Sequence, residues 1–181
     1  MTIIKPRLFD LIAKAEGGCA ESQFRLGLIY QNSAVRQDYP RAFYCFWLAA
    51  IEGSLAEAKC AIGQMYFEGL CVPQDRNEAF AWFSRAASQG NAEAQYVVGA
   101  YYFFGEYVAQ DYAAALEMFI EAAQGGYIAA KYYAAICYRD GLGIEQNDLE
   151  FFRWMKEAAD QGCTDAQCAL FAVENSASEL P

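Results

Sequence analysis

Small and apolar residues along the chain recur with the spacing of an α-helix, in segments that glycines separate. Residues 92–104 (AEAQYVVGAYYFF) carry such side chains at positions 94, 98, 99 and 102, which share one helical face. Residues 112–123 (YAAALEMFIEAA) carry them at positions 115, 116, 119 and 122. Gly105 follows the first segment and Gly125 and Gly126 follow the second, as expected where helices end. The pattern predicts two helices joined by a short connection.

This pair of helices recurs with a period of 36 residues. The period aligns four tyrosines and, separately, four small residues: Tyr30, Tyr66, Tyr102 and Tyr138, and Gly27, Gly63, Gly99 and Ala135. Several aligned positions at one fixed period predict a stack of similar helical pairs. We predict a single all-α domain over residues 1–181, with units at approximately 19–53, 54–90, 91–126 and 127–162 and half-unit caps at 7–18 and 163–177.

The recurring small residues are interpreted as packing devices. Gly63 and Gly99 fall inside predicted helices, where glycine costs about 1 kcal/mol relative to alanine. Such a cost is expected to persist where only the missing side chain lets another helix approach closely. Alanine pairs such as Ala122-Ala123 are expected to do the same on the second helix of each unit.

A short polar residue precedes the second helix of every unit: Asp38, Asp75, Asp111 and Asn147. A carboxylate that recurs in this way could be taken for a catalytic group. The position just before a helix favours another role, because a side-chain oxygen there accepts hydrogen bonds from unpaired amides of the first turn. We therefore interpret these four residues as N-caps.

Together these residues resemble the Sel1-like repeat, a relative of the tetratricopeptide repeat with a longer, glycine-marked loop. The third unit spells the motif as Ala92-Glu93-Ala94-Gln95, Gly99, Tyr102, Gly105, Val108, Gln110-Asp111, Ala115, Phe119, Ala122-Ala123 and Gly126. The first unit lacks the loop glycines, and the fourth has Ala135 for glycine and Asn147 for aspartate. The resemblance implies a right-handed α-α superhelix, or solenoid, whose first helices line a concave protein-binding face.

Positions that differ between units are the candidates for contact with a partner. On the first helices, we predict a binding groove formed by Arg25, Leu28, Gln64, Phe67, Tyr96, Val97, Phe103, Tyr132, Tyr133 and Arg139. Tyrosine and arginine are residues that dominate interface hot spots. The aromatic side chains could equally be additional core, because they lie next to the core positions. Both interpretations stay open at this point.

The charge balance bears on the partner. Thirteen Lys and Arg residues against 23 Asp and Glu residues give a net charge of −10. A chain this acidic repels a phosphate backbone, so we expect no nucleic-acid binding. Its field favours basic partners.

The residue inventory argues against most enzyme chemistry. The sequence contains no histidine, which excludes Ser-His-Asp and Cys-His catalysis and every zinc site that uses histidine. None of the seven cysteines forms a CxxC pair, and Cys163 with Cys168 has poor metal-ligand spacing. We expect reduced, mostly buried thiols and no metal or cofactor. The resemblance includes a cysteine-rich secreted subfamily, linked to penicillin binding, whose disulfide pattern is lacking here.

Two further expectations concern location. No apolar run is long enough to span a bilayer, and the first residues, with Pro6 and Asp10, do not form a secretory signal. We therefore expect a cytoplasmic protein without membrane insertion, as a monomer or weak dimer.

The sequence supports a non-catalytic module that binds a dedicated protein partner in its concave groove. One alternative is an immunity protein that neutralises a cognate, basic toxin, since small size and acidity suit an inhibitor of a basic effector. Another is an adaptor in a signalling or cell-envelope complex. A hydrolase or β-lactamase is the least favoured, because no residue is placed as an activated nucleophile or base.

Overall fold

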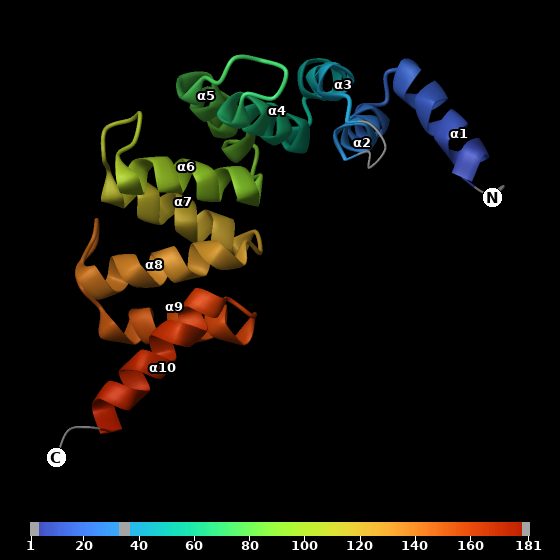
Figure 1. Cartoon of the computed structure of the whole chain (residues 1–181). Helices are drawn as coiled ribbons and strands as arrows, with labels where there is room; N and C mark the ends of the chain where they lie inside the picture. Colours follow the sequence, from blue (N-terminus) through green and yellow to red (C-terminus); the bar gives the residue numbers. More distant parts are fainter. Residues whose placement is uncertain (1–3, 33–36, 179–181) are drawn as a thin grey trace. The chain divides into compact units, whose positions relative to one another are not determined.

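The computed structural model describes residues 4–32 and 37–178, and this part of the chain is built from ten α-helices (Figure 1). They are α1 (Ile4–Glu16), α2 (Ala20–Gln31), α3 (Tyr39–Ile51), α4 (Ala56–Glu68), α5 (Arg76–Ala87), α6 (Ala92–Phe104), α7 (Tyr112–Gln124), α8 (Ile128–Asp140), α9 (Asp148–Asp160) and α10 (Thr164–Ser178). The prediction of an all-α repeat fold is confirmed.

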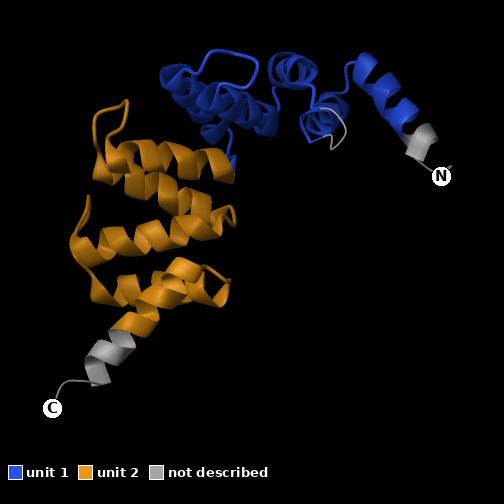
Figure 2. Cartoon of the chain, viewed as in Figure 1, with its two compact units in different colours: residues 1–91 blue, residues 92–181 orange. Residues whose placement is uncertain are grey.

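The helices form two compact units, Met1–Asn91 and Ala92–Pro181 (Figure 2). In the first unit each of α1 to α4 packs against the helix that follows it, and α6 to α9 do the same in the second unit. The helices α1 and α10 occupy the predicted half-unit caps. One continuous solenoid over residues 1–181 stays a prediction.

The loop within each helical pair is closed by the same backbone hydrogen bond. The amide of the N-cap residue donates to the carbonyl of the tyrosine that recurs every 36 residues. The four bonds run from Asp38 to Tyr30 (3.0 Å), Asp75 to Tyr66 (3.0 Å), Asp111 to Tyr102 (3.0 Å) and Asn147 to Tyr138 (2.9 Å). This constant geometry fixes where the second helix begins relative to the first.

The side chains of the same four residues cap the second helices, as predicted. Asp111 accepts hydrogen bonds from the amides of Ala113 and Ala114, both at 3.0 Å. Asp38, Asp75 and Asn147 likewise accept from amides of the first turn of α3, α5 and α9. These bonds satisfy donors that have no partner inside the helix.

The core of each pair forms where a residue without a large side chain faces a bulky one. A Cβ atom placed on Gly99 would lie 2.8 Å from Cε1 of the fully buried Phe119. Gly27 and Gly63 meet Phe46 and Phe83 in the same way, at 2.5 and 3.0 Å. The interpretation of the glycines as packing devices is confirmed.

The fourth repeat reaches a similar packing with different residues. Ala135 stands at the glycine position, and Met155 stands 36 residues after Phe119. Both are fully buried in the same hydrophobic cluster. The methyl group of Ala135 takes space that a rigid ring would need, whereas the unbranched side chain of Met155 adapts to the space that remains. We therefore expect the two changes to compensate each other.

The expectation of mostly buried thiols is wrong. All seven cysteines are free, and Cys45, Cys60 and Cys137 are buried, but three others are exposed. Cys19 and Cys71 lie in connections between helices, and Cys168 faces outward from α10. Connections run over the surface, so a cysteine there does not join the core.

The exchange between the third and fourth repeats generates a prediction. Gly99→Ala should lower the free energy of unfolding by about 1–3 kcal/mol, because the methyl group overlaps the Phe119 ring. Adding Phe119→Met should restore part of this loss, with a coupling of about 1 kcal/mol in urea unfolding of the four proteins. Phe151→Met on α9 is the control partner. Additive losses for Gly99 with Phe119 would contradict the compensation.

Candidate protein-binding face

The predicted groove residues of the first unit do not form one cluster. Arg25 pairs with Glu21 at 2.9 Å on the exposed side of α2. Leu28 is half-buried against the core, and Gln64 donates to Glu68 at 2.9 Å on α4. These side chains are largely engaged within their own helices.

Phe67 is the exposed aromatic residue among the predicted groove residues of this unit, with 38% of its surface accessible. The guanidinium of Arg76 lies over its ring, 3.5 Å from the centroid. Such a contact is a favourable cation–π interaction. The face of the ring that Arg76 covers is therefore not available to a partner.

In the second unit the predicted residues come together around Tyr133. The ring of Tyr133 on α8 lies 5.8 Å from Tyr96 and 5.6 Å from Phe103, both on α6, and 5.5 Å from Tyr132. These distances are typical of interacting aromatic pairs. We call Tyr96, Phe103, Phe104, Tyr132 and Tyr133 the aromatic cluster.

The aromatic cluster stands on the core. Phe119 of α7 is fully buried and stacks on Tyr133 with ring centroids 5.2 Å apart. Tyr96 and Phe103 each lie 6.0 Å from the same ring. The cluster members from the predicted groove are half-buried, as is Val97. They extend the core and also leave edges at the surface, so their role in binding a partner stays a prediction.

Phe104 is the most exposed member of the cluster and was missed by the sequence analysis. It is 54% exposed and lies 5.1 Å from Phe103 and 6.2 Å from Tyr133, measured between ring centroids. The neighbouring repeats carry Glu68 and Asp140 at this position. An aromatic residue that replaces a charged one in a single repeat is a signal that could have revealed it.

The hydroxyl groups of Tyr96 and Tyr132 stay protonated. Burial, and then the nearby Tyr133 and Tyr127, raise the pKa of Tyr96 to about 12. Burial, followed by the carboxylate of Asp165, also raises the pKa of Tyr132. Neutral phenols can donate hydrogen bonds to a partner, and Asp165 on α10 adds a negative charge close to them.

Arg139, at the C-terminal end of α8, is not a free cation. Its guanidinium makes two hydrogen bonds to the carboxylate of Asp140, at 2.7 and 2.8 Å. The pair raises the pKa of Arg139 and lowers the pKa of Asp140, with their mutual hydrogen bond as the largest cause of each shift. The side chain would have to leave this partner before it could bind another carboxylate.

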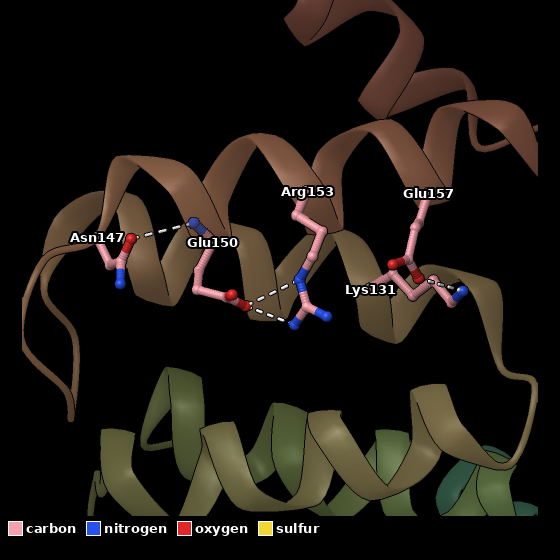
Figure 3. Close-up of polar contacts among 5 residues, drawn as sticks. All are labelled: Lys131, Asn147, Glu150, Arg153 and Glu157. Carbon is pink, nitrogen blue, oxygen red and sulfur yellow. Dashed lines mark hydrogen bonds and ion pairs between the residues drawn. The ribbon is translucent and has the colours of Figure 1, made fainter.

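Charged side chains of α9 form a row of ion pairs in the second unit. Figure 3 shows Glu150, Arg153 and Glu157 along one side of α9, with Arg153 paired to Glu150 and Glu157 beside Lys131 of α8. Lys131 is 10% exposed at its side chain and binds Glu157 at 3.0 Å. The Lys131–Glu157 pair joins the two helices of one repeat, and the Arg153–Glu150 pair lies within α9, so the charges of the row are already matched.

The column of Gln and Lys residues that contains Lys131 is polar throughout: Gln23, Lys59, Gln95, Lys131 and Gln167. In the third repeat Gln95 donates to Glu121 at 2.8 Å, at the position that Glu157 takes in the fourth. Gln167 donates to the carbonyl of Ala159, at the end of the preceding helix. The sequence shows the polar character of this column, but its partners follow only from the packed helices.

Within residues 4–32 and 37–178, no three His, Cys, Asp or Glu side chains converge in a way that could hold a metal ion. None of the helices in this part of the chain combines the length and apolar character that crossing a bilayer requires.

Comparison with known proteins identifies the repeat. A family model described as the Sel1 repeat matches residues 20–54, 56–91, 92–127 and 128–163. No curated protein matches the chain significantly. The matched segments agree with the predicted units to within one or two residues at each boundary.

Solved structures match as well. A Sel1 repeat protein from Oxalobacter formigenes is 31% identical, with a TM-score of 0.85 over 92% of this chain and 48% of its own. The protein c5321, a protective antigen of uropathogenic Escherichia coli, is 32% identical, with a TM-score of 0.79 over 86% of this chain and 33% of its own. Cysteine rich protein B of Helicobacter pylori shares the fold at 18% identity and a TM-score of 0.56, over 76% of this chain and 98% of its own. The chain thus spans about half or less of the first two proteins.

The N-cap interpretation can be tested at Asp111. Replacing it with alanine removes two hydrogen bonds to the first turn of α7 and should lower the free energy of unfolding by about 1 kcal/mol. Asp111→Asn keeps a side-chain oxygen and should retain most of the stability in urea unfolding. Equal losses for both variants would mean that the charge, and not the hydrogen bonds, is what matters.

Cys19 is expected to be alkylated at lower pH than Cys71. The hydroxyl of Ser22 donates to the Cys19 sulfur at 3.2 Å and lowers the pKa of that thiol, whereas burial raises the pKa of Cys71. The thiolate is the reactive form, so iodoacetamide labelling, followed by peptide mass spectrometry, should reach half its maximum rate at lower pH for Cys19. Ser22→Ala should move the Cys19 profile to higher pH. An unchanged profile would refute this role of Ser22.

Proposed function

The chain belongs to the Sel1 repeat family, and we propose that it is a non-catalytic module that binds one dedicated protein partner. Sel1 repeat proteins generally mediate interactions between proteins. Four repeats offer a limited surface, which suits one partner better than several. Its function would then depend on which residues vary at the surface of an otherwise constant scaffold.

The observation that carries the proposal is the aromatic cluster of the second unit. Its rings hold one another in place, and Phe104 at its edge is more than half exposed. Rings that are already fixed lose little conformational freedom on binding, which favours affinity. Large aromatic side chains are also enriched among interface hot spots. We therefore place the partner on the first-helix face of this unit, on α6 and α8.

The expected ligand is an extended segment or a helix of a basic protein. The net charge of −10 and the carboxylate of Asp165 beside Tyr132 favour a positively charged partner. Complementary charge would act mainly on the association rate and on the choice of partner. Apolar side chains of the ligand would cover the exposed edges of Phe104 and Tyr132.

A second candidate function is immunity against a basic toxin. The same charge favours it, since an acidic surface is suited to cover the active site of a basic effector such as a nuclease. This function and a generic adaptor role differ in the identity and number of proteins bound. They also differ in the phenotype of a deletion, which should be lethal only in the presence of the toxin for an immunity protein.

The first experiment is affinity capture from a lysate of the native host, with partners identified by mass spectrometry. The test variant Phe104→Ala/Tyr132→Ala truncates accessible members of the aromatic cluster and leaves Phe119 beneath it. The control Leu149→Ala/Phe152→Ala truncates two exposed apolar residues of α9, which are 78% and 45% accessible. Both variants must keep wild-type helicity by circular dichroism.

We expect one abundant partner that the test variant loses at least about tenfold and the control retains, since each hot-spot truncation costs about 1–2 kcal/mol or more. A basic toxin as that partner would support immunity, and a multi-protein assembly would support an adaptor. Retention of the same partner by the test variant would show that the binding face lies elsewhere.

A further inference from the structure

A cavity in the first unit lies between α1, α2 and α3, outside the aromatic cluster. Its volume is about 420 Å³, which is within the range of binding pockets. Leu26 and Leu48 supply apolar wall, and the polar side chains that line it are Glu16, Gln23, Tyr44 and Glu52. The cavity therefore combines an apolar surface with hydrogen-bond acceptors.

Gln23 has an acceptor that nothing within the fold satisfies. The side chain is 3% exposed, and its amide nitrogen donates to the carbonyl of Ala15 at 3.2 Å. Its oxygen Oε1 is buried and has no hydrogen-bond donor in the described part of the chain. A buried acceptor without a donor is unfavourable, and such groups call for a ligand or water.

The two glutamates of the cavity lie where a negative charge is least favourable. Glu16 is the last residue of α1, and Glu52 is the C-cap of α3. The C-terminal end of a helix carries a partial negative charge, which repels a carboxylate and attracts a cation. No ion pair of the described residues involves either glutamate.

Three cations of α2, α3 and α4 are engaged with other partners. They are Arg25 with Glu21, Arg41 with Asp38, and Lys59 with Ser54 and Gln89. Lys14 belongs to the last turn of α1 but does not line the cavity. The negative potential of the cavity is therefore not matched by any cation that lines it.

The second repeat has a lysine at the position that Gln23 takes in the first repeat. Lys59 stands 36 residues after Gln23, and its ammonium donates to the side chain of Gln89 at 2.9 Å. Gln89 and Glu52 each follow the N-cap aspartate of their helix by 14 residues. In the second repeat the donor is Lys59 and its acceptor is the side-chain amide of Gln89. In the first repeat the same two positions hold the neutral Gln23 and the carboxylate of Glu52.

We propose that this cavity binds an arginine side chain of the protein partner. The guanidinium would donate to Glu16, Glu52 and Oε1 of Gln23, and five N–H groups in a planar fork suit several acceptors. The ring of Tyr44, 62% exposed at the rim, offers a surface on which the guanidinium can stack. The aliphatic stem would lie on Leu26 and Leu48. The inference rests on the proposed function in that the arginine belongs to a bound protein.

The residue at the rim is specific to the first repeat. The positions equivalent to Tyr44 in the later repeats carry Ala81, Glu117 and Arg153. The ring, the neutral glutamine and the glutamate at the C-cap of α3 thus occur together at one end of the repeat array. This combination distinguishes the cavity from the same place in the other repeats.

The test is an NMR titration of the full chain with Nα-acetyl-arginine methylamide. Signals of the Gln23 side-chain amide and the Tyr44 ring should shift as the probe binds. The citrulline analogue, which has a neutral urea in place of the guanidinium, should bind at least about tenfold more weakly, because hydrogen bonds to charged groups are stronger. Equal binding of the two probes would overturn the proposal.

Two double variants distinguish specific binding in the cavity from general electrostatic attraction of the probe to the acidic chain. Glu16→Gln/Glu52→Gln should weaken binding of the arginine probe about tenfold. Its Tm should stay unchanged or rise, because two negative charges leave helix C-termini. The control Glu57→Gln/Glu68→Gln changes the same charge on α4, where Glu68 also ends a helix, and should bind the probe as the wild type does. Equal weakening by both variants would refute a specific site.

A titration with free L-arginine distinguishes two possible ligands of the cavity, an arginine side chain of a protein and the free amino acid. Binding of the free amino acid much more tightly than the blocked probe would overturn a protein-derived arginine. The outcome is also independent of the aromatic cluster. Probe binding without a captured partner would reject the proposed face and keep the cavity, whereas a captured partner without probe shifts at Gln23 and Tyr44 would reject the cavity alone.

Discussion

The close crossing of two helices at a small residue, glycine in the first three repeats and alanine in the fourth, is the constraint on which each repeat depends. The Phe119 ring occupies the space that a Cβ of Gly99 would take, and the equivalent rings do so at Gly27 and Gly63. A crossing this close leaves little freedom in how the second helix is placed. The same hydrogen bond from N-cap amide to tyrosine carbonyl can therefore recur in all four loops, and the repeat length stays at 36 residues through the glycine-marked units.

The same crossing determines where aromatic residues collect. In the third repeat the core between the paired helices contains the Phe119 ring together with small residues such as Ala115 and Ala122. Further rings of the first helices have no room there and pack on its outer side, as Tyr133 does over Phe119. A surface of half-buried rings is thus a product of tight packing below it. Whether a repeat presents such a surface depends on residues like Phe104, which the packing does not require.

The features that the sequence predicted correctly are those whose physical cause is local or repeated. An N-cap such as Asp111 needs only the helix that follows it, and the glycine positions could be read because their cost recurs with the period. The partners of polar side chains depend on helices distant in the sequence, so the pairing of Lys131 with Glu157 was not foreseen. Exposed residues of the second helices, such as Tyr44, do not follow from a prediction that places the binding face on the first helices. The surface cysteines were misjudged because burial was assigned from residue type.

The polar column beginning at Gln23 shows how a constant scaffold can still carry different chemistry. Each of its members reaches the end of a second helix, where carbonyls and acidic side chains gather and the helix dipole is negative. Lysine at this position satisfies the acceptors from within, as Lys59 and Lys131 do. Glutamine has one donor group and also an acceptor of its own. Because it is neutral, it does not balance the charge of acidic side chains that lie beside it. At Gln23 the acidic residues are present as Glu16 and Glu52, and no cation lines the cavity to balance them.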